Sequence, residues 1–356
     1  MYAIIMAGGY GTRFWPKSRR SLPKQFLAIG TRRTLLQETY DRLARLLPSD
    51  HIVVLTNALH VPLVRAQLPE LPAANLLAEP MVRDTAPCIR LAAALVAGRD
   101  SRETMLIVPS DHVIRDQEGF ARVVTALEAE LVREDGAVTI GIPPDRAETA
   151  YGYLEVGELL AHHAGVAVHR TLRFTEKPDL ATAERFLSGG THWWNSGMFA
   201  WRVDTLLEAY ATCLPEVAAL AEGLQGELDG PKRESVIEAF YREVTPISVD
   251  FGLMERYPHQ RTIKACFDWN DVGGWAAVPG EVTGNNRLIS GHLCDLDASG
   301  NIVDMAEHRK VVALLGVHDL VVVDTADALL ICPIGRSQEL KALLGKLRAQ
   351  GREDVL

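Results

Sequence analysis

Hydrophobic and polar positions in the first part of the chain form blocks, in which short apolar runs precede longer segments with apolar residues at helical spacing. The runs that we expect to be strands are YAIIMA (2–7), HIVVLT (51–56), NLLAE (75–79), TMLIVPS (104–110) and AVTIGI (137–142). Residues 34–47 and 84–99 show the helical pattern, and Asp84 or Thr85 caps the second segment, with Pro87 in its first turn. Strands that alternate with helices predict a parallel sheet covered by helices.

The pattern becomes less regular after residue 150. We expect strands at 151–156, 168–176 and 194–202, and helices near 180–188, 203–222 and 232–243. Residues 283–334 form short β-like segments separated by Gly, Asn and Asp, and 337–351 form an amphipathic helix. The pattern predicts an α/β domain over 1–282, with a Rossmann-like, mixed, mostly parallel sheet. It also predicts a small C-terminal β domain, of short β-helix type with a terminal helix, over 283–356.

Length and composition agree with two units. The chain has 356 residues, which exceeds the roughly 250–300 residues at which a single core usually stops growing. Hydrophobic residues make up 47% and charged residues 23%, as in globular proteins. We expect no membrane contact, because no apolar run approaches about 18 residues and the first residues do not resemble a signal peptide. The five cysteines have no zinc-ligand spacing, so we expect reduced side chains and a cytoplasmic location.

Charge is distributed unevenly along the chain. The net charge of −9 argues against binding to nucleic acid, yet residues 1–37 contain seven Lys or Arg and no Asp or Glu. Within this stretch an apolar strand leads directly into Gly8, Gly9 and Gly11, where backbone N–H groups can approach phosphate oxygens. Arg13 and Lys24 can neutralise charge on those phosphates. Neither a Walker P-loop nor a Rossmann G-x-G-x-x-G is present, and a glycine turn with solvated charges remains the alternative.

Two aspartates are candidates for a metal site. Asp111 lies just after the apolar run 104–110, and ligands of open α/β sheets bind at the carboxyl ends of strands. Mg²⁺ prefers a few carboxylates together with phosphate oxygens, and Asp271, in the polar turn DWNDVGGW, is the second candidate. A turn or helix-cap role is the alternative for each aspartate. For His112 we favour a packing or orienting role over metal binding.

The segment GGYGTRFWPKSRRSLPKQF (8–26) resembles the signature of the nucleoside-diphosphate-sugar pyrophosphorylases, and its ending PKQF is similar to the mannose-1-phosphate guanylyltransferase branch. The resemblance implies the fold of nucleotide-diphospho-sugar transferases. It implies that Arg13 and Lys24 are the catalytic residues that contact the phosphates. It also implies Mg²⁺ as cofactor, held by Asp111 and by Asp271 in a D-V-G-x-W motif. The other residues implied for the nucleotide loop are Ala7, Gly8, Gly9, Gly11 and Thr12.

Further segments resemble the same family. AEPMVRDTAP (78–87) is similar to the segment that lines the base and ribose, which implies nucleotide contacts from Glu79, Arg83 and Thr85. Ordinary helix capping is the alternative for this segment. AYGYLEV, FTEKP and WNSGMFAW are similar to the sugar-phosphate segments, which implies roles for Gly152, Glu176, Lys177 and Asn195. A strand with a bulge at Gly197 would explain the last segment equally well, and both readings can hold together.

The resemblance implies that GMP is transferred from GTP to mannose-1-phosphate, giving GDP-mannose and pyrophosphate. The implied mechanism is a Mg²⁺-assisted, in-line attack of the sugar phosphate on the α-phosphorus. We also expect a homodimer, because the apolar strands of the C-terminal β segment offer an edge for pairing. Longer relatives carry a C-terminal sugar-isomerase domain of cupin type, so we expect no isomerase activity here. Three alternatives stay open: another pair of hexose-1-phosphate and nucleoside triphosphate, a non-catalytic regulatory subunit that binds nucleotide sugar, and a nucleotide-binding scaffold.

Overall fold

The computed structural model describes residues 1–9, 11–278, 280–306 and 310–356. The chain folds into two compact units. The first unit consists of residues 1–8, 40–109 and 114–269, and the second of 9–39, 110–113 and 270–356. The chain therefore enters the second unit within two residues of the ends of two strands of the first unit, which end at Ala7 and Pro109. The sequence-based domain boundary between residues 282 and 283 stays a prediction.

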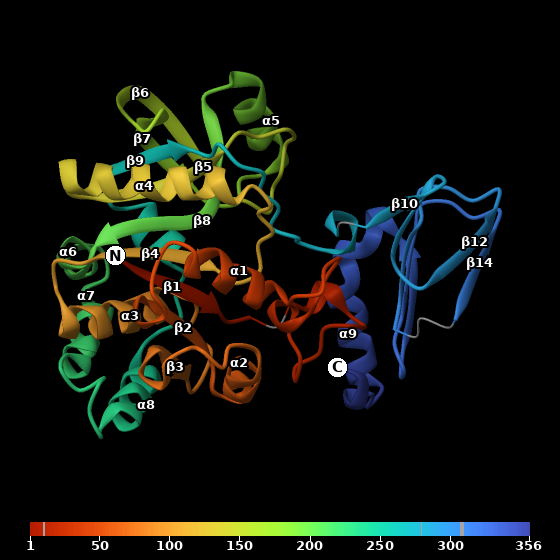
Figure 1. Ribbon diagram of the computed structural model, residues 1–356, viewed down its shortest axis with the longest axis horizontal. Helices are drawn as coiled ribbons and strands as arrows, with labels where there is room; N and C mark the ends of the chain where they lie inside the picture. Colours follow the sequence, from red (N-terminus) through yellow and green to blue (C-terminus); the bar gives the residue numbers. More distant parts are fainter. Residues whose placement is uncertain (10, 279, 307–309) are drawn as a thin grey trace. The chain divides into compact units, whose positions relative to one another are not determined.

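A nine-stranded sheet forms the centre of the first unit, in the order β3-β2-β1-β4-β8-β5-β9-β7-β6 (Figure 1). The strands are β1 (Tyr2–Ala7), β2 (Ile52–Asn57), β3 (Leu76–Glu79), β4 (Thr104–Pro109), β5 (Ala137–Ile142), β6 (Tyr153–His163), β7 (Val166–Thr175), β8 (His192–Arg202) and β9 (Gln260–Lys264). β1 to β4 pair in parallel. β8 is antiparallel to β4, β5 and β6, and β7 is antiparallel to β6 and β9. Only β7 and β8 therefore run against the other strands of this sheet, which confirms a mixed, mostly parallel sheet.

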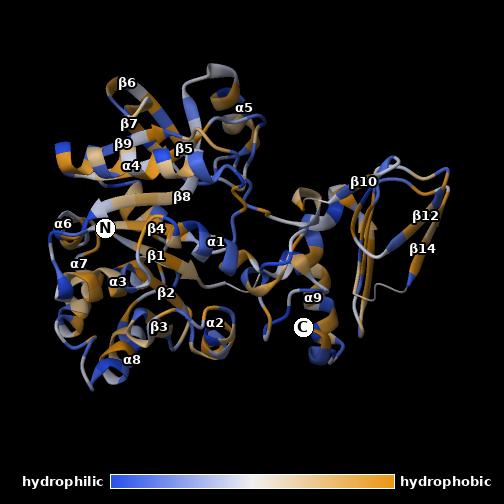
Figure 2. Cartoon of the chain, in the orientation of Figure 1, coloured by the Kyte–Doolittle hydropathy of each residue, from blue (hydrophilic) through white to orange (hydrophobic). Residues whose placement is uncertain are grey.

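The helices that pack in the first unit follow from capping residues and apolar spacing. They are α1 (Leu35–Ala44, which starts in the second unit), α2 (Val61–Gln67), α3 (Thr85–Arg99), α4 (Gln117–Arg133), α5 (Leu180–Gly189), α6 (Val203–Cys213), α7 (Pro215–Leu220) and α8 (Arg233–Glu243). Thr34 and Gln37 form a reciprocal capping box at the start of α1. α3 is buried almost throughout, whereas α4 alternates hydrophobic and hydrophilic positions (Figure 2). Such a pattern lets α4 cover the sheet on one side and face solvent on the other.

Two features of the first unit differ from the sequence-based expectation. The helix expected over 203–222 is divided, because Pro215 lacks an N–H donor and disfavours helical geometry at Leu214. α2, α4 and β9 were not identified from the sequence. α4 has the usual signal, since Phe120, Val123 and Leu127 recur at helical spacing and are buried.

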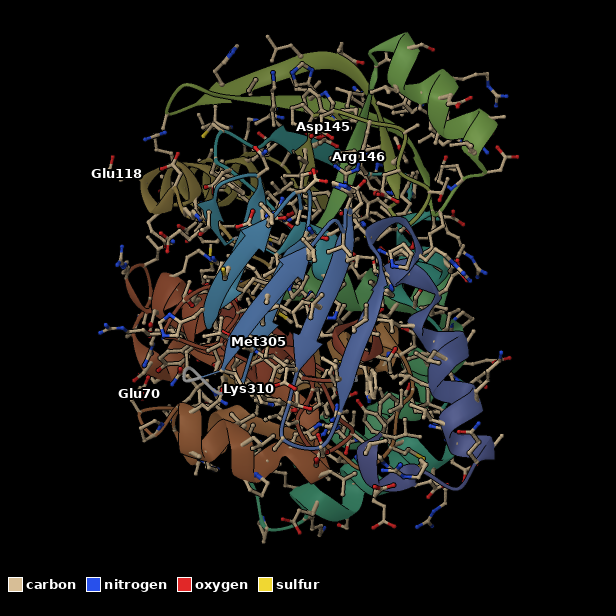
Figure 3. The ribbon with its side chains drawn as sticks, turned by 90° about the vertical axis from the view of Figure 1, so that its right-hand side faces the viewer. Glu70, Glu118, Asp145, Arg146, Met305 and Lys310 are labelled. Atoms are coloured by element: carbon tan, nitrogen blue, oxygen red, sulfur yellow. The ribbon has the colours of Figure 1, made fainter. Side chains whose placement is uncertain are left out.

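The second unit contains short strands that coil in two layers. The strands are β10 (Glu281–Thr283), β11 (Asn286–Ser290), β12 (His292–Leu296), β13 (Ile302–Met305), β14 (Val311–Leu315), β15 (Leu320–Asp324) and β16 (Leu329–Pro333), and helix α9 (Leu340–Ala349) follows them. β11, β13 and β15 pair in parallel in one sheet, and β12 and β14 pair in parallel in another. From β11 to β15, successive strands thus alternate between the two sheets, as in a short β-helix. Figure 3 looks onto these strands, with Met305 at the end of β13 and Lys310 next to β14 labelled.

Buried amides support the coil. Asn286 and Asn301 are both buried, and the side-chain nitrogen of Asn301 donates to the side-chain oxygen of Asn286 at 2.8 Å. The backbone N–H of Leu320 donates to Asn301 Oδ1 at 3.0 Å. This ladder satisfies the polar groups where successive turns of the coil stack. The small C-terminal β domain of β-helix type is therefore confirmed.

The glycine-containing loop near the N-terminus packs into the second unit together with these strands. Trp15 Nε1 donates to the carbonyl of Val355 at 2.6 Å, and Lys17 Nζ lies 2.6 Å from the buried carboxylate of Asp304. Phe14 and Trp275 share an apolar cluster with side chains of β13, β15 and α9. The 9–39 segment therefore belongs, in its packing, to the C-terminal part of the chain.

None of the helices in the described ranges is long and apolar enough to cross a membrane. All five cysteines are free thiols.

Candidate functional site

The glycine loop of the second unit depends on Gly11. Its φ of 55° lies in the left-handed region, and a Cβ atom at this position would lie 2.3 Å from Cβ of Lys24. Gly11 precedes a 3-10 turn (Thr12–Phe14), and Lys24 begins a second one (Lys24–Phe26). Only glycine satisfies both the backbone angle and the close approach, so this residue brings the two turns together.

Lys24 is the centre of the charged groups in this unit. Its side chain is almost fully buried, and Nζ donates to Asp111 Oδ2 at 2.8 Å and to the backbone carbonyl of Asp271 at 2.7 Å. Burial alone would raise the pKa of Asp111, but the ammonium group of Lys24, with a smaller contribution from His112, outweighs burial and holds this pKa below its ordinary value. Asp111 is therefore an anion at neutral pH, and Lys24 is fixed beside it.

A short backbone bridge connects the two candidate metal-binding segments. The N–H of Val113 donates to the carbonyl of Asn270 at 2.8 Å, and the N–H of Asn270 donates to the carbonyl of Val113 at 3.0 Å. Asn270 Oδ1 also accepts the N–H of Val272 at 2.7 Å. Asp111 lies two residues before Val113, and Asp271 lies one residue after Asn270. These bonds therefore hold Asp111 near Asp271.

The turn after Asp271 has a strained backbone. Val272 has φ of 46°, which is unusual for a β-branched residue, and its side chain is fully buried. Such a conformation costs of order 1–3 kcal/mol and persists only where the surrounding packing imposes it. Asp271 Oδ1 accepts the N–H of Gly273 at 3.2 Å within the same turn. The turn thus holds Asp271 in one orientation.

A cavity of about 310 Å³ in the second unit gathers most of the residues that the sequence assigns to phosphates and metal. It is lined by Gly11, Thr12, Arg13, Phe14, Lys24, Asp111, His112, Asp271 and Gly273. Arg13 is exposed, and its guanidinium donates to the carbonyl of Gly273 at 3.2 Å. His112 Nε2 lies 4.0 Å from Asp111 Oδ1, a position that fits the orienting role. Two cationic side chains and two carboxylates therefore face one polar cavity.

This donor set fits a hard cation that is shared with a substrate. Within the described ranges, no group of three or more His, Cys, Asp or Glu side chains could hold a metal ion by itself. Mg²⁺ commonly takes only one or two carboxylates, and phosphate oxygens and water complete its coordination. Asp111 and Asp271, both in the wall of this cavity, match that requirement.

Other predicted nucleotide residues lie in the first unit, at the ends of its parallel strands. Ala7 ends β1 and its carbonyl accepts the hydroxyl of Thr56, and a Cβ on Gly8 would lie 3.8 Å from Glu79 Oε2. Glu79 ends β3, and Tyr241 Oη donates to its Oε1 at 2.8 Å. Burial raises the pKa of Glu79 to about 7, although the bond from Tyr241 partly opposes this. The strand ends thus carry a buried, readily protonated carboxyl.

Arg83 and Thr85 connect the loop after β3 to residues 241–249. Arg83 Nε donates to the carbonyl of Tyr241 at 2.8 Å, and Thr85 Oγ1 accepts the N–H of Val249 at 2.8 Å. Asp84 caps α3 by accepting the N–H of Thr85, although its φ of 66° is rare outside glycine. The capping alternative from the sequence accounts for these contacts, and nucleotide contacts of Arg83 and Thr85 stay a prediction.

The four predicted sugar-phosphate residues come together in the first unit. A Cβ on Gly152 would lie 2.6 Å from Glu176 Oε2 and 3.3 Å from Cβ of Asn195, so the strand passes close to both side chains. The N–H of Asn195 donates to the carbonyl of Gly152 at 2.8 Å. Glu176 is buried and forms an ion pair with the exposed Lys177. Gly197 has φ of 70° and the β5–β8 register shifts here, so the predicted bulge is also present.

Asp250 joins this group and was not identified from the sequence. The side-chain nitrogen of Asn195 donates to Asp250 Oδ1 at 3.1 Å. Burial, together with the negative charge of the neighbouring Glu176, raises the pKa of Asp250 to about 7. Asp250 starts a five-residue π-helix, Asp250–Met254, which is a rare element that often occurs at functional sites. Asp250 lies in the segment SVDFGLMER (248–256).

We expect Asp250→Asn to remove part of the pH dependence of stability. Between about pH 4 and 7 the folded protein keeps the Asp250 proton and the unfolded chain releases it, so the free energy of unfolding falls as pH rises. One such proton contributes a slope of at most about 1.4 kcal/mol per pH unit. Urea unfolding at several pH values measures the free energy of unfolding. The difference between the variant and the parent should change in favour of the variant through this window and become constant near pH 8.

The matched control is Asp145→Asn, a change at an exposed aspartate that pairs with Arg146, both labelled in Figure 3. This control should follow the parent at every pH. Parallel curves for Asp250→Asn and the parent would contradict the raised pKa.

Comparison with known proteins identifies the family. Residues 2–279 match the nucleotidyl transferase family, and residues 291–347 match the MannoseP isomerase/GMP-like beta-helix domain. The first match contains every candidate site residue described above. The second covers most of the coiled strands and α9.

Three similar proteins illustrate the relationship. The "Xanthan biosynthesis protein XanB" of Xanthomonas campestris and the "Mannose-1-phosphate guanylyltransferase" of Escherichia coli are each 35% identical to the chain, over 99% of its length. The chain spans 74% and 75% of those two proteins, respectively. A crystal structure from Thermus thermophilus, described as "mannose-1-phosphate geranyltransferase", is 33% identical with a TM-score of 0.84, and the alignment covers 98% of this chain and 99% of that one. The chain therefore belongs to the nucleotidyl transferase family.

Proposed function

We propose that the protein transfers GMP from GTP to mannose-1-phosphate and releases pyrophosphate. The observation that carries the proposal is the cavity in which Arg13, Lys24, Asp111 and Asp271 face one another. The similarity to proteins named mannose-1-phosphate guanylyltransferase supports the choice of substrates. A regulatory subunit without activity would not need two cations and two carboxylates in one cavity.

In the proposed mechanism, an oxygen of the sugar phosphate attacks the α-phosphorus of GTP in line, and pyrophosphate leaves. No side chain acts as a nucleophile, so the protein contributes positioning and neutralisation of charge. Backbone groups of Gly8, Gly9, Gly11 and Thr12 would approach the phosphates of GTP. Arg13 and Lys24 would neutralise negative charge that develops on the transferred group and on pyrophosphate. Lys24 is already held in place by Asp111, so little reorganisation is required.

We propose Mg²⁺ as the cofactor, since nucleotidyltransferases of this family generally use a divalent metal ion. Asp111 and Asp271 would hold it, and the ion would supply positive charge next to the phosphate oxygens. Asp111 is suited to this role because its pKa is held below the ordinary value.

Base and sugar would be bound by residues of the first unit. We assign the base and ribose to Ala7, Glu79, Arg83 and Thr85, among which the Glu79 carboxyl can accept from the N–H groups of guanine. We assign the sugar phosphate to the group formed by Gly152, Glu176, Lys177 and Asn195, to which the structure adds Asp250. Carboxyl and amide groups suit a sugar, because each hydroxyl both donates and accepts. A wrong epimer would leave one of these buried groups unpaired.

The test is pyrophosphate release by the purified protein with Mg²⁺. GTP, ATP, UTP and dTTP are each combined with mannose-1-phosphate and with glucose-1-phosphate. Release mainly from GTP with mannose-1-phosphate supports the proposal. Release with another pair keeps the chemistry but changes the substrate, and release with none of the eight pairs would favour a regulatory subunit.

We also propose a cytoplasmic homodimer. Free cysteines agree with a reducing compartment. Exposed apolar side chains on β12, β14 and β16 offer a surface for a second copy of the chain: Leu296, Val311, Leu315, Leu329 and Ile331. Sedimentation velocity at several concentrations should show a dimer that Leu315→Glu weakens. A monomer at all concentrations would contradict this assembly.

A further inference from the structure

The second unit contains another cavity, of about 420 Å³, on the glycine loop. Its wall combines side chains of loop residues 12–20 with side chains of α9 and of the residues after it. We call the cavity of about 310 Å³ that Lys24, Asp111 and Asp271 line the nucleotide cavity. Thr12 is the one residue that lines both cavities. Nothing in the proposed reaction uses the larger cavity, although its volume is in the range that holds small molecules. We call it the loop–α9 cavity.

Arginine supplies the positive charge of the loop–α9 cavity. Arg19, Arg20 and Arg348 line it, and no lysine does. Arg19 is anchored, because its guanidinium pairs with Asp327 at 2.9 Å. Arg348 is exposed on α9, and its guanidinium has no ion-pair or hydrogen-bond partner in the part of the chain that the structure describes. Glu353 is the one acidic side chain among the residues that line this cavity, against three arginine side chains.

The remaining wall combines two hydroxyl residues, Thr12 and Ser18, with three apolar side chains. Trp15, Leu344 and Leu356 contribute apolar surface. Trp15 is fixed because its indole N–H donates to the carbonyl of Val355 at 2.6 Å, and the Arg19 guanidinium lies 5.6 Å from the centre of its ring. A buried aromatic ring beside several guanidinium groups is a surface that can hold an apolar body and an anionic group at once.

We propose that the loop–α9 cavity binds a small amphipathic phosphate, that is, an apolar or aromatic body carrying a phosphate group. Planar guanidinium groups bind phosphate through paired hydrogen bonds, which favours this anion over a simple halide. Arg348 would pair with the phosphate, and Trp15 with Leu344 would contact the body. The carboxylate of Glu353 would accept a hydrogen bond from a hydroxyl or amino group of the ligand.

Such a ligand would also act on the glycine loop. It would contact Thr12 and the anchored Arg19, and the same loop continues into Arg13 of the nucleotide cavity. We therefore expect an occupied loop–α9 cavity to change KM for GTP. This consequence rests on the proposed function, whereas binding itself does not.

Binding is tested by calorimetric titration of the full chain, with GTP and Mg²⁺ present to occupy the nucleotide site. The probes are 1-naphthyl phosphate, octyl phosphate and inorganic phosphate. We expect at least one organic phosphate to bind with Kd below about 1 mM, and more tightly than inorganic phosphate. Preference for the naphthyl or for the octyl probe distinguishes an aromatic, nucleoside-like source from an aliphatic one.

Variants on one helix locate the site. Arg348→Ala and Arg348→Glu should weaken binding roughly tenfold or more, since each removes a guanidinium–phosphate contact. Lys346→Ala removes an exposed lysine of α9 that does not line the cavity, and it should bind the probe as the parent does. Equal affinities in all variants, or organic phosphates that bind no better than inorganic phosphate, would overturn the proposal. The result stands even if no pyrophosphate is released in the activity assay, because titration requires no turnover.

Discussion

Replacing Lys24 by Met should lower kcat by roughly 10²-fold or more, on the scale of losing one preorganised charge-stabilising donor. Methionine keeps most of the buried stem and removes the ammonium group that bonds to Asp111 and to the carbonyl of Asp271. If Lys24 acts mainly in the transition state, kcat and kcat/KM should fall together. Steady-state pyrophosphate release over a range of GTP concentrations measures both.

The control for this variant is Lys17→Met in the same loop. Lys17 is also ion-paired, to Asp304, but it does not line the nucleotide cavity. It therefore reports the effect of losing an ion pair from the loop, without loss of charge at the phosphates. Equal losses in the two variants, or turnover of Lys24→Met within about threefold of the parent, would contradict the catalytic assignment of Lys24.

The strands and several residues of the polar cavity could be predicted because their signals are local. Apolar runs at 2–7, 51–56 and 104–110 became the parallel strands β1, β2 and β4, and the rule that ligands gather at carboxyl ends of strands led to Asp111. The acid-free stretch 1–37 predicted an anion site from residue types alone. Asp271 was paired with Asp111 because its motif resembles that of a known family. The position of Asp271 in a turn would by itself fit a structural role equally well.

Long-range contacts could not be predicted in the same way. The bridge between Val113 and Asn270 joins segments 157 positions apart, and no periodic pattern encodes such a pair. Asp250 contacts Asn195 from a π-helix that has no apolar repeat to reveal it. The anchoring of Lys17 by Asp304 likewise depends on how the N-terminal loop packs with β13. The loop–α9 cavity results from this packing, so it became visible only in the structure.

The strained turn at Val272 shows why motif and geometry need to be read together. The sequence DVGGW gives Val272 no reason to adopt a positive φ, which glycine would adopt more readily. Its buried side chain packs with Phe14 and Trp275 in the same apolar cluster. The packing that holds Val272 therefore also fixes the orientation of Asp271, the residue before it, relative to the glycine loop within the second unit.

Replacing Asp271 by Asn should abolish most Mg²⁺-dependent activity, with a loss of roughly 10²-fold or more, because the metal ion that this carboxylate would hold supplies several kcal/mol of charge stabilisation. Asparagine can keep the side-chain acceptor for the N–H of Gly273, and its backbone carbonyl can still accept from Lys24. The variant thus removes a negative charge while it preserves the turn. The Mg²⁺ concentration for half-maximal rate should rise in Asp271→Asn and likewise in Asp111→Asn.

Asp268→Asn is the matched control, because Asp268 lies three residues earlier in the same segment and accepts the backbone N–H groups of Arg115 and Asp116 instead. Its Mg²⁺ dependence should equal that of the parent. Asp111→Asn has a second consequence, since it leaves the buried ammonium of Lys24 without its anionic partner, which should lower thermal stability as well as activity. Asp271→Asn should lose activity with little change in stability. An unchanged Mg²⁺ requirement in both Asp111→Asn and Asp271→Asn would refute the two-carboxylate site, even if their rates were low.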